Sequence, residues 1–129
     1  MLFADKAPAI IKIGLVANIE QVVWLRQVIT HAKQANMNLL VVYDPVGQAS
    51  VGGSFSTFTL EQLSPLLQQV DVVTPNLMEA QSLAQLSQDQ PSDILAKKIY
   101  QDFSITSIIV KGGHSHEHEE LVIDFCYHQ

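Results

Sequence analysis

The chain has 129 residues, which is enough for one domain with a hydrophobic core and too short for two domains of ordinary size. Its composition, 47% hydrophobic and 16% charged, is that of a folded protein and excludes a disordered chain. A formal net charge of −6 has the wrong sign for binding a phosphate backbone, so nucleic acid is excluded as an expected partner.

The first segment of the chain predicts a strand, a helix and a second strand. Residues 10–17 form an almost unbroken apolar run, which indicates a strand buried on both faces. Asn18 and Gln21 then form a candidate capping box, and apolar side chains follow at helical spacing to about residue 36. Residues 38–43 are the second predicted strand, which ends at Asp44-Pro45 because proline cannot continue a ladder.

The middle of the chain predicts a loop, a short helix and a third strand. Residues 47–58 are rich in glycine, serine and threonine without a period, which indicates a loop beside the end of the second strand. Thr59 and Gln62 form a capping box for a helix to about residue 69, which Pro65 is expected to break or bend. The third strand is predicted at residues 70–74.

The last part predicts helices at residues 76–86 and 92–103 and a strand at 106–111. A polar stretch at 114–120 leads to a fifth strand at 121–127, joined to the fourth as a hairpin. Strands that alternate with helices pair in parallel through right-handed crossovers. The sequence therefore predicts an α/β protein with a layered, mainly parallel sheet.

Polar residues follow the apolar runs of three predicted strands. They are Asp44, then Asn76 with Glu79, then Lys111. Ligands of open α/β sheets bind beyond the carboxyl ends of the strands, so these residues are candidates for a common site. Two carboxylates, an amide and an ammonium suit a Mg²⁺-phosphate group better than an apolar ligand.

Each of these motifs also has a purely structural interpretation. Asn76 and Glu79 have the spacing of a capping box, which explains the pair without any ligand, although a helix N-terminus also attracts phosphate. Asp44 could be a solvated carboxylate at the end of a strand. Gly112-Gly113 after Lys111 is a common way out of a strand, but it also permits close approach of the backbone to phosphate. The sequence leaves both interpretations open.

Other features carry less chemistry. His114, His116 and His118 share one face of an extended segment and could hold a transition metal, but a polar hairpin tip explains the same residues without any ligand and is the preferred interpretation. Trp24 and Met37 are expected to pack against other side chains. The lone cysteine excludes an intrachain disulfide and suits a cytoplasmic location, and neither a signal peptide nor a membrane segment is predicted.

Four motifs, in this order and spacing, resemble the hydroxymethylpyrimidine/phosphomethylpyrimidine kinases of thiamine biosynthesis, members of the ribokinase-like superfamily. They are Lys12-Ile13-Gly14, Asp44-Pro45-Val46, Thr74-Pro75-Asn76-Leu77-Met78-Glu79-Ala80 and Val110-Lys111-Gly112-Gly113-His114. The resemblance runs from about residue 9 to 127 and implies a three-layer fold, a parallel sheet flanked by helices, of which residues 1–129 are one partial domain.

The resemblance implies transfer of phosphate from ATP, with Mg²⁺, to hydroxymethylpyrimidine and then to its monophosphate. Asp44 and Glu79 would act near Mg²⁺ through water, and Lys111 is the one candidate for a catalytic side chain. The residues implied to contact the nucleotide are Asn76, Lys111, Gly112 and Gly113. Those implied to border the pyrimidine are Gly14, Leu15 and Val46.

The sequence also departs from the family. Relatives carry a Ser-Asp-Ser-type strand end in an N-terminal segment and a Gly-Thr-Gly-Cys stretch that forms an anion hole, and neither lies within residues 1–129. Residues 47–53 differ from the usual Met-Val-Ala-Lys-Ser-Gly. We therefore expect the 129-residue chain alone to be inactive.

Two alternative functions remain open from the sequence. One is a pyridoxal kinase, which shares the Asp-Pro-Val and Thr-Pro-Asn-x-x-Glu motifs, and another is a non-catalytic remnant that binds nucleotide or a partner. For partners, a homodimer and a fusion to another thiamine enzyme are both compatible with the residues.

Overall fold

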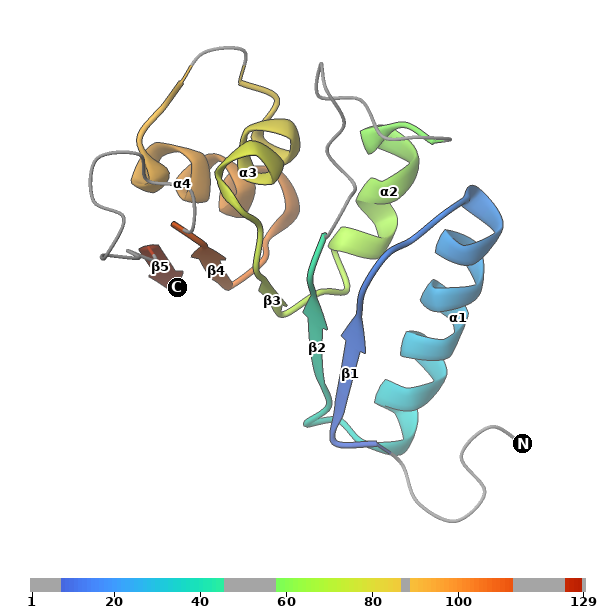
Figure 1. Cartoon of the computed structure of the whole chain (residues 1–129). Helices are drawn as coiled ribbons and strands as arrows, with labels where there is room; N and C mark the ends of the chain where they lie inside the picture. The colour runs from blue at the N-terminus through green and yellow to red at the C-terminus, as the bar shows by residue number, and fades with distance from the viewer. Residues whose placement is uncertain (1–7, 46–57, 87–88, 113–124, 129) are drawn as a thin grey trace.

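The computed structural model describes residues 8–45, 58–86, 89–112 and 125–128. Within them the chain forms five strands and four helices (Figure 1). In chain order these are β1 (Ile10–Ile13), α1 (Ile19–Ala35), β2 (Leu40–Tyr43), α2 (Leu60–Leu67), β3 (Val72–Val73), α3 (Leu77–Ala84), α4 (Ser92–Phe103), β4 (Ser107–Val110) and β5 (Phe125–His128).

The strands form one sheet whose spatial order, β1-β2-β3-β4-β5, is the order of the chain. β1 to β4 run parallel, and β5 pairs antiparallel with β4, which confirms the predicted α/β class and the antiparallel last strand. Ile13, Tyr43, Val73 and Ile108 lie side by side in one row of the ladder. The carboxyl ends of the four parallel strands therefore meet at a single edge.

Two of the three predicted capping boxes form as expected. In α2 the side chain of Thr59 accepts from the Gln62 N–H while the Gln62 side chain accepts from the Thr59 N–H, and α3 has the same reciprocal pair at Asn76. The α1 box is different, because the Gln21 side chain accepts from Ala17 N–H instead of from the cap residue. Each arrangement satisfies backbone donors that have no partner inside the helix.

The prediction that Pro65 could break its helix is wrong, since α2 continues through Pro65 to Leu67. Proline removes a backbone donor and crowds the carbonyl four residues earlier. Only two residues of α2 follow Pro65, so few helical hydrogen bonds depend on the region that it disturbs.

The helices of the described residues cover one face of the sheet. Strand residues of this face, including Val41, Tyr43 and Ile108, are buried in a single cluster with apolar residues from all four helices. The opposite face carries Ile10, 59% exposed, and Leu40, 39% exposed, and none of its residues belongs to the cluster. The described residues thus form two layers, the sheet and one layer of helices, and the second helical layer of the expected three-layer fold is not among them.

This arrangement corrects the expectation for residues 10–17. β1 spans only Ile10–Ile13 and lies at the end of the sheet, with Ile13 buried and Ile10 and Lys12 exposed. Leu15, which follows it, is 66% exposed. An apolar run shows that a strand can be buried on both faces. Whether it is buried depends on whether other helices or strands cover each face of the sheet.

The expectation that Trp24 and Met37 pack against other side chains is also wrong, because their side chains are 56% and 90% exposed. Both residues lie on the surface of α1 or just after it, whereas Val22, Ile29 and Ala32 form the buried stripe of this helix. Among the residues that the structure describes, no helix combines the length and the apolar character needed to cross a membrane.

At the amino ends of the strands, Asp71 connects several elements. Its Oδ2 accepts from the Val41 N–H (2.8 Å), and its backbone carbonyl accepts from the Ser107 N–H (3.1 Å). Lys33 of α1 lies 3.8 Å from the same carboxylate. Because β3 has only two residues, these contacts hold its neighbours in register from outside the strand.

Candidate functional site

The predicted site residues lie at the carboxyl edge of the parallel strands. Asp44 follows β2, Asn76 and Glu79 begin α3 just after β3, and Lys111 follows β4. β2 and β3 are neighbours, so the two carboxylates project from one edge as the sequence predicted. This placement follows from the parallel register alone.

Asp44 and Lys111 form an ion pair, with Lys111 Nζ 3.2 Å from Asp44 Oδ1. The Asp44 side chain is 19% exposed and the Lys111 side chain 39%. Their backbones are held by the sheet, since the Asp44 N–H donates to the Ile13 carbonyl and the Lys111 N–H to the Pro75 carbonyl, both at 2.8 Å. The two backbones are therefore fixed on either side of the end of β3, where the side-chain charges meet.

Asn76 and Glu79 form the capping box of α3. The Asn76 N–H donates to Glu79 Oε1 (2.8 Å), and the Glu79 N–H donates to Asn76 Oδ1 (2.7 Å). Glu79 is only 6% exposed and is the one buried charged residue among those described. Asn76 also forms an isolated parallel bridge with Lys111, which ties the start of α3 to the end of β4.

The chain itself shows that a capping box does not require this charge. Gln62 occupies the same third helical position in α2 and accepts from the Thr59 N–H at 2.9 Å. A neutral amide thus makes the same hydrogen bond, and burying a charge costs more than burying an amide. The hydrogen bonds of the cap explain the position of Glu79 and do not require a carboxylate there, although a negative charge is favourable at a helix N-terminus.

Tyr43 is a residue of this edge that the sequence did not single out. It is the last residue of β2 and is fully buried. Burial raises the pKa of its phenol well above the usual range, and the nearby carboxylates of Glu79 and then Asp44 raise that pKa further. The signal in the sequence was its place two residues after Val41, on the same face of the strand.

The residues implied to border the substrate are only partly described. Gly14 and Leu15 follow β1 at the same edge and are exposed, and a Cβ at Gly14 would meet nothing within 4 Å. Gly112 follows Lys111 and is half-buried. Val46, Gly113 and the histidines at 114, 116 and 118 lie outside the described residues.

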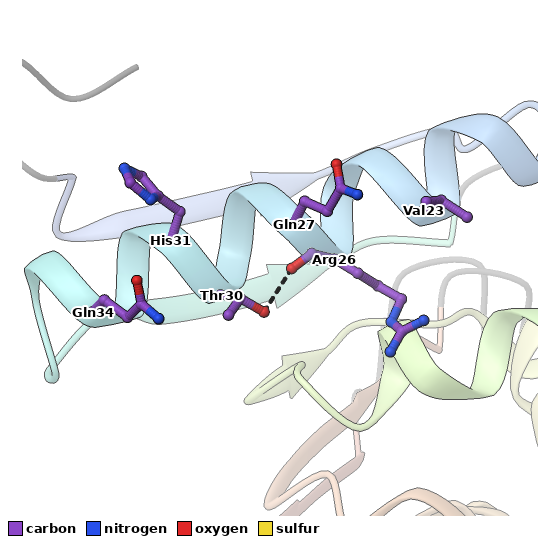
Figure 2. A pocket seen from close by; sticks show the side chains of 6 residues that line it. All are labelled: Val23, Arg26, Gln27, Thr30, His31 and Gln34. Atoms are coloured by element: carbon purple, nitrogen blue, oxygen red, sulfur yellow. Dashed lines mark hydrogen bonds between the residues drawn. The ribbon is translucent and has the colours of Figure 1, made fainter. Parts of the chain in front are cut away.

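Two surface hollows lie elsewhere, on α1. The larger, of about 420 Å³, is lined by Val23, Arg26, Gln27, Thr30, His31 and Gln34 (Figure 2). Its only drawn hydrogen bond joins the Thr30 hydroxyl to the Arg26 carbonyl within the helix, at 2.8 Å. The other, of about 320 Å³, lies beside it near Trp24. Residues of one helix line each hollow, so neither brings chemical groups together from separate elements.

The carboxyl edge can offer oxygen ligands and a cation, but not a complete cage for a metal. Within residues 8–45, 58–86, 89–112 and 125–128, no three His, Cys, Asp or Glu side chains gather around one point. Mg²⁺ is commonly held by one or two carboxylates together with water and substrate phosphates. The donor set of Asp44 and Glu79 fits a Mg²⁺ ion that arrives with phosphate, with Glu79 Oε1 already engaged in the cap.

Comparison with known proteins agrees with this geometry. A model of the family described as phosphomethylpyrimidine kinase matches residues 1–129. A hydroxymethylpyrimidine/phosphomethylpyrimidine kinase of Staphylococcus aureus (strain Mu50 / ATCC 700699) is 33% identical over 130 residues, which cover 98% of this chain and 45% of the relative. The chain thus spans less than half the length of the curated relatives it matches.

Solved structures show the same fold. A pyridoxal kinase from Staphylococcus aureus in complex with ADP is similar with a TM-score of 0.66 and 26% identity, covering 95% of this chain and 43% of that one. A putative phosphomethylpyrimidine kinase from Bacteroides thetaiotaomicron, in a form with pyridoxal, is similar with a TM-score of 0.69 and 21% identity, covering 93% and 43%. The fold is ribokinase-like, and the chain belongs to the phosphomethylpyrimidine kinase family.

Proposed function

We propose that this chain forms the Mg²⁺- and phosphate-binding edge of an ATP-dependent kinase that phosphorylates hydroxymethylpyrimidine and its monophosphate. The observation that carries the proposal is that the buried carboxyl group of Glu79 and the Asp44–Lys111 ion pair lie at the same edge of the sheet, beyond the carboxyl ends of the parallel strands. Family membership and the nucleotide complex of a related pyridoxal kinase support it. The chain would then be one part of a single kinase domain in the cytoplasm.

In this proposal Asp44 and Glu79 hold Mg²⁺ through its water shell, and Lys111 contacts phosphate oxygens. Bound Mg²⁺ neutralises charge on the phosphoryl group during transfer. Asn76, at the N-terminus of α3, presents an amide and the positive end of a helix to the same region. Gly112 and Gly113 would let the backbone approach phosphate beside Lys111.

At the other end of this edge, Gly14 and Leu15 would border the pyrimidine together with Val46. The exposed position of Gly14 and Leu15 after β1 leaves both accessible to a ligand. A homodimer, or a fusion to another thiamine enzyme, stays a prediction about partners.

A pyridoxal kinase is the second candidate. The related structures include a pyridoxal kinase at 26% identity and a putative phosphomethylpyrimidine kinase in a form with pyridoxal, which supports pyridoxal as an alternative acceptor. Both candidates use the same phosphate edge, and they differ in the groups that contact the ring of the acceptor.

The test measures transfer of labelled phosphate from Mg·ATP to hydroxymethylpyrimidine and to pyridoxal, in the full gene product that carries this chain. We expect phosphorylated pyrimidine and, in an Asp44→Asn variant, a fall in kcat/KM of about 10²-fold or more, the scale for removing one preorganised charge contact. A Lys97→Met variant, which changes an exposed lysine of α4, should keep wild-type activity. Transfer to pyridoxal alone would favour the second candidate, and transfer to neither would refute both.

A further inference from the structure

The Asp44–Lys111 ion pair joins two strands that are not neighbours. β3 lies between β2 and β4 in the sheet (Figure 1). The Lys111 side chain therefore reaches across the end of β3 to the carboxylate of Asp44. Backbone hydrogen bonds to Ile13 and Pro75 fix both residues where they leave the sheet. Any change in this pair must therefore come from the side chains.

The two side chains differ in their freedom to move. Lys111 has four rotatable methylene groups and is 39% exposed, whereas Asp44 has one methylene and is 19% exposed. The lysine can therefore leave the contact while its backbone stays in place, and the aspartate cannot move far. In the structure the Lys111 ammonium donates a hydrogen bond to Asp44 Oδ1, and a metal cation at this edge would use the same oxygen as a ligand.

A divalent cation and the Lys111 ammonium cannot both be held closely by one carboxylate. A cation bound to Asp44 directly or through one water would lie closer to the ammonium than the Debye length of about 8–10 Å at ordinary salt, so the like charges would repel. The divalent ion carries twice the charge of the ammonium and is therefore attracted more strongly to the Asp44 carboxylate. The lysine is then expected to be the group that moves.

We propose that the Asp44–Lys111 ion pair is a lock on the phosphate edge, which a divalent cation opens by displacing Lys111 from Asp44. The inference rests on the proposed function, because it takes Mg²⁺ and phosphate as ligands of this edge. The displaced ammonium becomes available to phosphate oxygens, and so cation binding strengthens phosphate binding. By linkage, phosphate that engages Lys111 strengthens cation binding by the same factor.

The experiment uses the 129-residue chain with Mn²⁺ as a paramagnetic substitute for Mg²⁺. In Lys111→Met the competitor is gone, and we expect Mn²⁺ to bind up to about fivefold more tightly than in wild type, the factor that corresponds to the upper end of measured exposed ion pairs. Lys97→Met is the matched control, since it removes one exposed lysine outside the site and should leave Mn²⁺ affinity unchanged. Far-ultraviolet circular dichroism checks that each variant is folded.

A second measurement needs no variant of the pair. In wild type labelled with ¹³C at the lysine ε carbon, Mg²⁺ should shift the Lys111 signal in a saturable way while the Lys97 signal stays constant. With Mg²⁺ present, inorganic phosphate should shift the Lys111 signal at lower concentration than without it.

The outcomes separate this inference from the proposed function. Equal or weaker Mn²⁺ binding in Lys111→Met, or an unresponsive Lys111 signal, overturns the lock. If Asp44→Asn then still abolishes cation binding, the metal role in the proposed function survives. A lock that opens with Mg²⁺ in a full gene product that transfers no phosphate supports the inference and refutes the proposed function. Cation binding to none of the proteins overturns both.

Discussion

Replacing Glu79 by glutamine separates its role in the helix cap from a role of its charge. Glutamine keeps an oxygen that can accept from the Asn76 N–H, as Gln62 does for Thr59 in α2. The change removes a favourable charge at a helix N-terminus, about 0.3–1 kcal/mol, and relieves part of the cost of burying a carboxylate. We therefore expect the free energy of unfolding to change by less than about 0.5 kcal/mol in Glu79→Gln.

Alanine at the same position has a different effect. It removes the 2.8 Å hydrogen bond and leaves the half-buried Asn76 N–H without its side-chain acceptor. Loss of a cap costs about 1 kcal/mol, and an unsatisfied buried donor costs about 1–3 kcal/mol. In urea unfolding, the free energy of unfolding should therefore be similar for wild type and Glu79→Gln and lower for Glu79→Ala.

Cation affinity tests the charge. If Glu79 holds a water of the Mg²⁺ shell, Glu79→Gln should weaken Mn²⁺ binding by roughly tenfold with little change in stability, because one of two carboxylates is lost. Glu61→Gln is the matched control, because Glu61 is an exposed acid in the first turn of α2 and takes no part in its cap. Unchanged Mn²⁺ binding in Glu79→Gln would mean that Glu79 acts only as a helix cap. If Glu79→Gln lowered the free energy of unfolding as much as Glu79→Ala does, the capping argument would be refuted.

Three further predictions concern stability and exposure. Asp71→Ala leaves the N–H of buried Val41 without its acceptor and should lower the free energy of unfolding by about 1–3 kcal/mol, while Asp71→Asn should lose less, as measured by urea unfolding. The raised pKa of Tyr43 means that the unfolded chain ionises first, so stability present at neutral pH should fall as the pH rises above about 10, and less so in Tyr43→Phe; parallel urea curves for both proteins would contradict this. Trp24, the only tryptophan, should emit close to free N-acetyltryptophanamide and be quenched readily by iodide, and Trp24→Ala should change the free energy of unfolding by less than about 0.5 kcal/mol.

Features set by neighbouring residues were predictable from the sequence. The boxes at Thr59 and at Asn76 depend on groups three positions apart, and both form as the sequence indicated. The alternation of strands and helices gave the parallel sheet, because chain connectivity and handedness leave few ways to pair such strands. The same parallel order predicted that Asp44 and Glu79 would project from one edge.

Features set by distant residues were not predictable in the same way. Asp44 and Lys111 are separated by 67 positions, and their contact depends on the length of β3 and on the register of three strands. The burial of β1 on one face only, and the exposure of Trp24 and Met37, depend on which elements lie nearby, which apolar character alone does not specify. The roles of the site residues in metal, nucleotide and substrate binding stay predictions.

The identity between strand order and chain order has a consequence for how the protein is made. In the described sheet each strand from β2 onward pairs with the strand that precedes it, so no strand has to wait for a partner that is synthesised later. Each parallel pair joins residues at least 30 positions apart, such as Ile10 with Leu40 and Val42 with Val72. Pairing with a still more distant strand would cost more loop-closure entropy. During translation the described strands can therefore join the sheet in chain order, one β-α-β unit at a time as far as β4, and the Asp44–Lys111 contact, which needs β4, is completed after β2 and β3 are in place.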